Sequence, residues 1–188
     1  MYLLTAPTLE PVTVSDAKFA ARVDGSHWDV PIAGMIAAAR QVAEHETGQR
    51  LMLQTWRHEL EDWPAADDLL PELRPSAVAV SYWSAGSAWA SLAAEAYVWS
   101  PAGPALWSIA LAPAIGTSWP ALGEVAIGPR VRIDVTSGSA GFTAPPAAVQ
   151  FIKALVALMV ADPTLTAQDV LAANAYLRHM LDPIRIYR

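Results

Sequence analysis

Apolar residues recur at helical spacing in two stretches near the start of the chain. The segment Thr13-Val14-Ser15-Asp16 has the form of a capping box, in which a hydroxyl accepts from the amide three residues later, and it predicts a short helix. The next repeat predicts a second helix over about residues 30–47, with Gly48 as its C-terminal cap. Arg40 and Glu44 lie four residues apart on the face opposite the apolar repeat, so we expect a weak ion pair there.

After residue 50 the pattern changes to an alternation of apolar and polar residues, which favours strands. The alternation begins at Leu51 and is cleanest in Val131-Arg132-Ile133-Asp134-Val135. Three short runs between these ends predict further strands, at residues 78–82, 97–99 and 106–109. Five prolines between Ser100 and Pro129 indicate irregular loops in the same region.

Helical spacing returns in the last quarter of the chain. Pro145-Pro146 opens a third helix that is apolar nearly all round, which is typical of a buried central helix. Thr166-Ala167-Gln168-Asp169 repeats the capping-box pattern and opens a fourth helix. Asp182-Pro183 ends this helix, because proline disfavours helix at the residue before it. Residues 184–188 remain as a tail.

These elements predict an α+β fold, in which both chain ends form a helical bundle and a β-rich segment is inserted between them. We expect the helical core in residues 1–50 and 139–188, and the insertion in residues 51–138. Residues 182–188 are expected to form a C-terminal tail that binds a partner. A length of 188 residues suits one domain, or a small core with one inserted lobe.

The composition indicates either a large core or apolar surface that a partner covers. Apolar residues make up 54% of the chain and charged residues 16%, whereas average globular chains carry about 25% charged residues. The formal net charge of −6 argues against a general nucleic-acid binder, which needs a basic face. Disulfides and cysteine zinc sites are excluded, because the chain has no cysteine. Neither a signal peptide nor a membrane-spanning apolar run is present, so we expect a soluble, unsecreted protein.

Three segments, taken in order, carry a resemblance to a known family. The first joins PVTVSDAKFAARVD to the helix AAARQVAEHETGQRL and the strand LQTWRHEL. The second is the Trp- and Pro-punctuated β region, which ends in VRIDVTSG, and the third is PPAAVQFIKALVALMV with the closing Pro-Ile-Arg-Ile-Tyr-Arg. Together they span nearly the whole chain and resemble the phage head–tail connector family of head-completion adaptors. The β region is longer and richer in Trp than the family pattern, and the third helix carries fewer charges, which leaves the partner of the insertion open.

The resemblance implies a virion structural protein of a bacteriophage or prophage, present in the host cytoplasm during assembly and then at the head–tail junction. Members of the family form a homo-oligomeric ring, typically twelve-fold, between the portal protein and the stopper or tail-completion protein. DNA passes through the channel that they line, without sequence-specific binding. The resemblance implies no enzyme activity, no cofactor and no membrane. Because the family's C-terminal segment commonly engages the portal, portal binding is assigned to Ile184, Arg185, Ile186, Tyr187 and Arg188.

The tail also has the composition of an interface segment. Ile184 and Ile186 alternate with Arg185 and Tyr187, and Arg and Tyr are common interface anchors. A frayed chain end is the alternative interpretation. If Pro183 separates the tail from the helices, its backbone can pair with a partner strand or lie in a groove.

The motifs reveal no catalytic, cofactor-binding or metal site. The four histidines, His27, His45, His58 and His179, lack a ligand spacing such as H-E-x-x-H. Neither G-x-S-x-G around Ser84 and Ser87 nor a phosphate-binding glycine pattern occurs. The adjacent acids Glu61-Asp62 and Asp67-Asp68 are more typical of a solvated turn than of an acid/base pair.

Five tryptophans gather in the β region: Trp83, Trp89, Trp99, Trp107 and Trp119. Large aromatic side chains suit the core of a small sheet, a protein interface, or a platform on which a sugar stacks. The last possibility gives an alternative function, a small β-rich ligand-binding or accessory domain that uses the Trp cluster.

Overall fold

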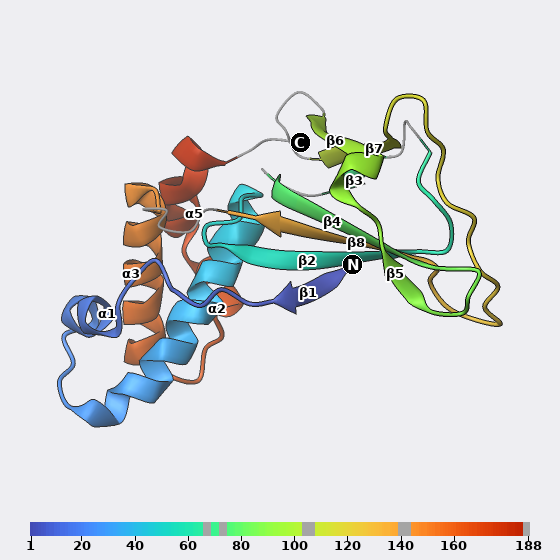
Figure 1. Cartoon of the computed structure of the whole chain (residues 1–188). Helices are drawn as coiled ribbons and strands as arrows, with labels where there is room; N and C mark the ends of the chain where they lie inside the picture. Colours follow the sequence, from blue (N-terminus) through green and yellow to red (C-terminus); the bar gives the residue numbers. More distant parts are fainter. Residues whose placement is uncertain (66–68, 72–74, 103–107, 139–143, 186–188) are drawn as a thin grey trace. The chain divides into compact units, whose positions relative to one another are not determined.

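The computed structural model describes the chain except for residues 66–68, 72–74, 103–107, 139–143 and 186–188. Helices combine with antiparallel sheets (Figure 1). The chain divides into a β unit, Met1–Pro7 with Leu53–Ser139, and a helical unit, Thr8–Met52 with Ala140–Arg188. Within the described residues, each helix is too short or too polar to cross a membrane.

A five-stranded antiparallel sheet makes up one part of the β unit. Its strands, in spatial order, are β1 (Tyr2–Thr5), β2 (Gln54–Leu60), β8 (Val131–Ser137), β4 (Pro75–Trp83) and β5 (Trp89–Ser91). The alternation predicted for β8 is present: Val131, Ile133 and Val135 are fully buried, while Arg132 and Asp134 between them are half-buried. One face of this sheet is therefore apolar and the other polar.

A three-stranded antiparallel sheet completes the β unit. It consists of β3 (Leu69–Pro71), β7 (Ser108–Pro113) and β6 (Tyr97–Ala102), in that order, and η2 (Ala94–Ala96) precedes β6. One buried cluster joins the two sheets. It comprises Val80, Val131, Ile133 and Val135 from the larger sheet and Leu70, Tyr97, Ile109 and Leu111 from the smaller one. The two apolar faces therefore pack on each other, and burial stabilises both sheets together.

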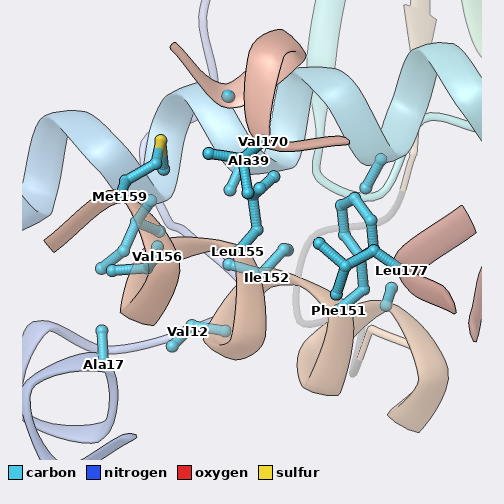
Figure 2. Packing of buried hydrophobic residues seen from close by; sticks show 14 of the residues in the cluster. Val12, Ala17, Ala39, Phe151, Ile152, Leu155, Val156, Met159, Val170 and Leu177 are labelled. Carbon is cyan, nitrogen blue, oxygen red and sulfur yellow. The ribbon is translucent and has the colours of Figure 1, made fainter. Parts of the chain in front are cut away.

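The helical unit packs around α3 (Pro146–Ala161). Its other elements are α1 (Val14–Ala21), η1 (Ser26–Trp28), α2 (Asp29–Thr47), α4 (Ala167–Ala173), α5 (Ala175–Leu181) and η3 (Asp182–Ile184). Figure 2 shows Ile152 and Leu155 of α3 close to Ala39 of α2 and Val170 of α4. Because α3 is apolar nearly all round, it can contact α1, α2, α4 and α5 at once.

The first strand, β1, is absent from the sequence-based prediction, which placed residues 1–50 in the helical core. Instead, β1 pairs with β2 and belongs to the β unit, with Tyr2 opposite Arg57 and Leu3 opposite Trp56. All four β1 residues are exposed, so burial gives them no alternating pattern. The strand forms because it pairs with β2, some fifty residues later in the sequence. The residues of β1 themselves therefore carry no local signal of a strand.

The predicted fourth helix is two helices, α4 and α5, separated at Asn174. The backbone of Asn174 is non-helical, with φ −126° and ψ 83°, and its side-chain Nδ2 donates to the carbonyl of Val170 at 2.8 Å. An asparagine side chain that bonds the backbone competes with continued helix. This interruption lets α4 and α5 take separate courses over α3.

The predicted ion pair of Arg40 and Glu44 forms, but it is buried: both side chains are about 95% buried. Arg40 Nη1 donates to Glu44 at 3.1 Å, and Arg40 Nε donates to Glu10 at 2.8 Å. The amide of Leu51 donates to the other oxygen of Glu44 at 2.9 Å. Glu10 precedes α1 and Leu51 follows α2, so neighbouring segments cover the polar face of α2 and bury the pair.

Candidate functional site

The first residues of the predicted partner-binding tail are bound to the helical unit. Gln49 donates from its side chain to the carbonyl of Ile184. Arg185 Nε donates to the carbonyl of Glu46 at 3.0 Å, and its Nη2 donates to the Glu46 carboxylate at 3.1 Å. Ile184 and Arg185 are therefore not free of the helices, contrary to the expectation from Pro183. Ile186, Tyr187 and Arg188 lie outside the described residues.

Glu46 of α2 is the acid that two arginines face near this end of the chain. Its carboxylate faces Arg185 and also lies 3.9 Å from Nη2 of Arg178. The side chains of Arg185 and Glu46 are 23% and 20% exposed, whereas Arg178 is 53% exposed. Since burial strengthens an ion pair and exposure screens it, Glu46 holds Arg185 more firmly than Arg178.

The described tryptophans of the β unit mostly pack on one another. Trp63 and Trp119 stack with ring centres 4.5 Å apart, and Trp63 Nε1 donates to the carbonyl of Pro120 at 2.9 Å. Trp63 packs against the β core together with Trp99 and Trp119. Trp107 lies outside the described residues. Trp63 is not among the five tryptophans singled out from the sequence, and its place beside Pro64 gives no sign that it stacks with a ring 56 positions later.

A second aromatic pair lies at the edge of the larger sheet. Trp83 of β4 and Trp89 of β5 meet edge to face with ring centres 5.7 Å apart. The guanidinium of Arg132 lies 3.8 Å from the centre of the Trp89 ring, a cation–π contact. The Trp89 face is therefore already covered by a cation from the same chain.

Ion pairs between neighbouring strands neutralise the polar face of this sheet. Arg57 binds both oxygens of Asp134, at 2.6 and 2.7 Å, and these hydrogen bonds raise the pKa of the Arg57 guanidinium above its ordinary value. Arg132 donates to Glu59 at 2.9 Å. Each arginine has its acid directly across the strand pair, so the face offers little net charge to a polyanion.

The residues that we considered for catalysis or metal binding make structural contacts in the described parts of the chain. Among the described residues, no group of three or more His, Asp or Glu side chains can hold a metal ion. Asp62 pairs with Arg130 at 3.3 Å on the surface, while Asp67 and Asp68 lie outside the described residues. Ser84 Oγ donates to the carbonyl of Ala88 in the β4–β5 turn. His58 is buried in β2, and His179 lies 2.9 Å from Asp182.

Comparison with known proteins finds neither a family model nor a curated protein that matches this sequence. Several solved structures do match. A chain from the neck of an empty gene transfer agent (GTA) particle, computed with C6 symmetry, superimposes with a TM-score of 0.68 at 19% identity, covering 100% of this chain and 97% of that one. A chain from the virion of the native particle gives 0.69 at 21% identity, covering 99% and 95%.

A chain from the neck of the native particle, computed with C12 symmetry, gives a TM-score of 0.62 at 21% identity and covers 100% of this chain and 97% of that one. These likenesses extend over both units and leave almost no part of either chain unmatched. The chain therefore has the fold of structural components of a gene transfer agent particle.

Proposed function

We propose that this chain is a structural subunit of the neck of a phage or phage-like particle. The observation that carries the proposal is the extent of the match: 100% of this chain and 97% of a neck chain superimpose with a TM-score of 0.68. A match confined to one unit would support only a shared module. A match over the whole length supports a shared role for the whole polypeptide, and the matched proteins are particle components rather than enzymes.

In this role, copies of the chain form a closed ring around a channel through which DNA passes. The C6 and C12 symmetry of the matched neck assemblies supports a cyclic homo-oligomer. In a ring, two different surfaces of the subunit meet repeatedly, which requires apolar surface on the isolated chain. Such surface is present, since Phe19 is 89% and Tyr176 76% exposed.

Within the neck, we assign the chain the adaptor position between the portal and the stopper or tail. The support is the sequence resemblance to head-completion adaptors and the chemistry of the tail, in which Arg185, Tyr187 and Arg188 offer charge and hydrogen bonds beside Ile184 and Ile186. Glu46 and Gln49 hold the first two of these residues, Arg185 and Ile184, against the helical unit.

The observations favour this role over a ligand-binding domain built on tryptophan. A sugar platform needs an open aromatic face. The Trp63 and Trp119 rings stack on each other and the Trp89 ring faces Arg132, so these faces are taken by groups of the same chain.

Electron microscopy and light scattering of the purified protein, alone and mixed with its portal protein, test the ring. We expect closed rings alone at high concentration, or rings attached to the portal. A monomer under both conditions would contradict the proposal.

The tail assignment is tested by replacing the last three residues: Ile186→Ser, Tyr187→Ser and Arg188→Ser in one variant. The contacts of Ile184 and Arg185 remain, so we expect an unchanged melting temperature, and portal binding should be lost. The matched control is Ile115→Ser with Ile127→Ser, which removes two apolar side chains that are 101% and 95% exposed in the β unit. Portal affinity equal to wild type in the tail variant would refute the assignment.

A further inference from the structure

Two exposed aromatic side chains border one hollow on the surface of the helical unit. This hollow, of about 490 Å³, is lined by Phe19 of α1, Ala154 and Ala157 of α3, and Tyr176 of α5; we call it the aromatic hollow. Gln150, Lys153 and Met180 also line it, and the rings of Phe19 and Tyr176 are 89% and 76% exposed. Most phenylalanines are buried, so Phe19 at this exposure needs an explanation.

A second hollow, of about 720 Å³, lies between α2 and α4. Ala38 and Val42 of α2 and Leu171 and Ala172 of α4 supply apolar surface, and Arg178 of α5 stands at its border. We call it the α2–α4 hollow. It is larger than the aromatic hollow, and its lining includes the exposed imidazole of His45 but no Phe, Tyr or Trp side chain.

Helix geometry places the two hollows on different faces of the helical unit. A residue advances 100° around an α-helix, so Ala154 and Ala157 point away from the buried Leu155 and Met159 of α3, which face α2 and α4. On α2, Ala38 and Val42 are half-buried and lie beside the buried residues Ile36, Ala39 and Ala43, at the border with α4.

The last helix agrees with this arrangement. In α5, Tyr176 borders the aromatic hollow, and Arg178, two residues later and so on the opposite face, borders the α2–α4 hollow. The aromatic hollow is lined from α1, α3 and α5 and the other from α2, α4 and α5, so the two hollows share only α5, on which they occupy opposite faces.

We propose that the two hollows are the two halves of the contact between neighbouring copies of this chain: Phe19 and Tyr176 of one copy seat in the α2–α4 hollow of the next. This inference rests on the proposed ring and names its subunit interface. A projecting surface and a receiving surface on different faces produce a head-to-tail contact, the kind that closes into a ring when the rotation fits.

The area that Phe19 and Tyr176 can bury is a large part of what an interface between two copies needs. A phenylalanine and a tyrosine bury about 150–250 Å² each. Together they supply roughly 300–500 Å² of the about 800 Å² per partner that a specific interface needs. The helix surfaces beside them have to provide only the remainder.

The charges at the two hollows are also complementary. Asp16 borders the aromatic hollow; it is 55% exposed and only 3.8 Å from Lys153. Arg178 borders the other hollow; it is 53% exposed and 3.9 Å from Glu46. Both distances are near the upper limit for an ion pair. The half-exposed Asp16 and Arg178 can therefore each bind an opposite charge on the next copy. Asp16 of one copy then faces Arg178 of its neighbour.

The absence of cysteine from the chain makes crosslinking a direct test. One variant carries Ala20→Cys beside Phe19, and the other carries Gln168→Cys in the α2–α4 hollow. The two are mixed, one with a size tag, and treated with a short bismaleimide. We expect crosslinks between unlike variants, almost none between like variants, and a ladder of oligomers when one chain carries both cysteines. Thr164→Cys, exposed and outside both hollows, sets the background.

A second experiment replaces the two aromatic side chains that are proposed to anchor the contact. Phe19→Glu with Tyr176→Glu should weaken self-association by about tenfold or more, as loss of interface anchors does, and should leave the circular dichroism spectrum unchanged because both side chains are exposed. Mixed with Gln41→Glu/Ala172→Glu, which blocks the other hollow with charges of the same sign, this variant keeps one intact contact and should form heterodimers and nothing larger.

Rings that crosslink like with like, or that still assemble after loss of both aromatic side chains, would overturn this interface and leave the proposed ring standing. A protein that remains monomeric at every concentration and on the portal would overturn both.

Discussion

Replacing Arg40 with methionine tests the buried charge cluster of the helical unit. The Arg40 side chain is 5% exposed and binds Glu44, which is 4% exposed, and Glu10, which is 29% exposed. Methionine fills a similar volume without charge, so the variant keeps most of the packing and removes only the cation. Glu44 then keeps the amide of Leu51 as a partner but loses the Arg40 cation.

The expected loss of stability is large. Removing one partner of a buried ion pair costs about 3–5 kcal/mol, because the remaining charge stays buried and uncompensated. For a chain of this size each kcal/mol lowers the melting temperature by about 2–4 °C, so we expect a decrease of roughly 6–20 °C. Far-UV circular dichroism during urea and thermal unfolding follows the helices and measures the change. Arg40→Met combined with Glu44→Leu should recover part of the loss, since no unpaired charge remains at α2.

The matched control is Arg130→Met in the β unit. Arg130 pairs at 3.3 Å with Asp62, which is 73% exposed, and exposed pairs contribute only about 0–1 kcal/mol. If Arg40→Met costs no more than Arg130→Met, the argument that burial makes the α2 pair critical is wrong.

Further predictions concern glycines and a helix cap. Gly34→Ala should stabilise the helical unit by about 0.5–1 kcal/mol, because Gly34 is exposed and the added carbon meets no atom within 4 Å. Gly123→Ala should destabilise the β unit by about 1–3 kcal/mol, because that carbon would lie 2.2 Å from the carbonyl oxygen of Ser84; urea unfolding measures both. Asp169→Asn should lower stability at neutral pH, since hydrogen bonds from Thr166 hold the pKa of Asp169 below its ordinary 3.8. That contribution is complete above the ordinary pKa and is lost as the pH falls through the lowered folded value, so the two proteins should converge in strong acid.

Elements with strong local signals could be predicted from the sequence. The second predicted helix, about 30–47, corresponds to α2 at Asp29–Thr47, with Gly48 in the left-handed conformation at its end. Alternation in β8 and the Pro-initiated α3 also match. In each case one segment contains both its periodicity and its end signal, so distant residues are not needed to recognise it.

The remaining features depend on residues far apart in sequence. β1 exists because of β2, and the burial of Arg40 requires Glu10, which lies 30 positions away. The contact of Arg185 with Glu46 joins residues 139 positions apart. Pro183 alone suggested a free tail because nothing near it in sequence indicates Glu46.

The aromatic hollow shows a different limit of the sequence. Phe19 lies two residues after the fully buried Ala17, a spacing that places it on the opposite face of α1. Spacing therefore indicates that Phe19 points away from the core. It gives no sign that Tyr176, more than 150 positions later, borders the same hollow, because that depends on how α5 crosses α3.

Glu46 belongs to both proposed contact regions. Its carboxylate binds Arg185 at the start of the tail, and it also lines the α2–α4 hollow. A neighbouring copy seated in that hollow lies beside the residue that binds Arg185, so the two proposed contact regions share one side chain. A substitution of Glu46 would disturb both and could not separate them. Changes at residues 186–188 act on the tail alone, and cysteines at positions 20 and 168 report the hollows alone, which makes those the informative variants.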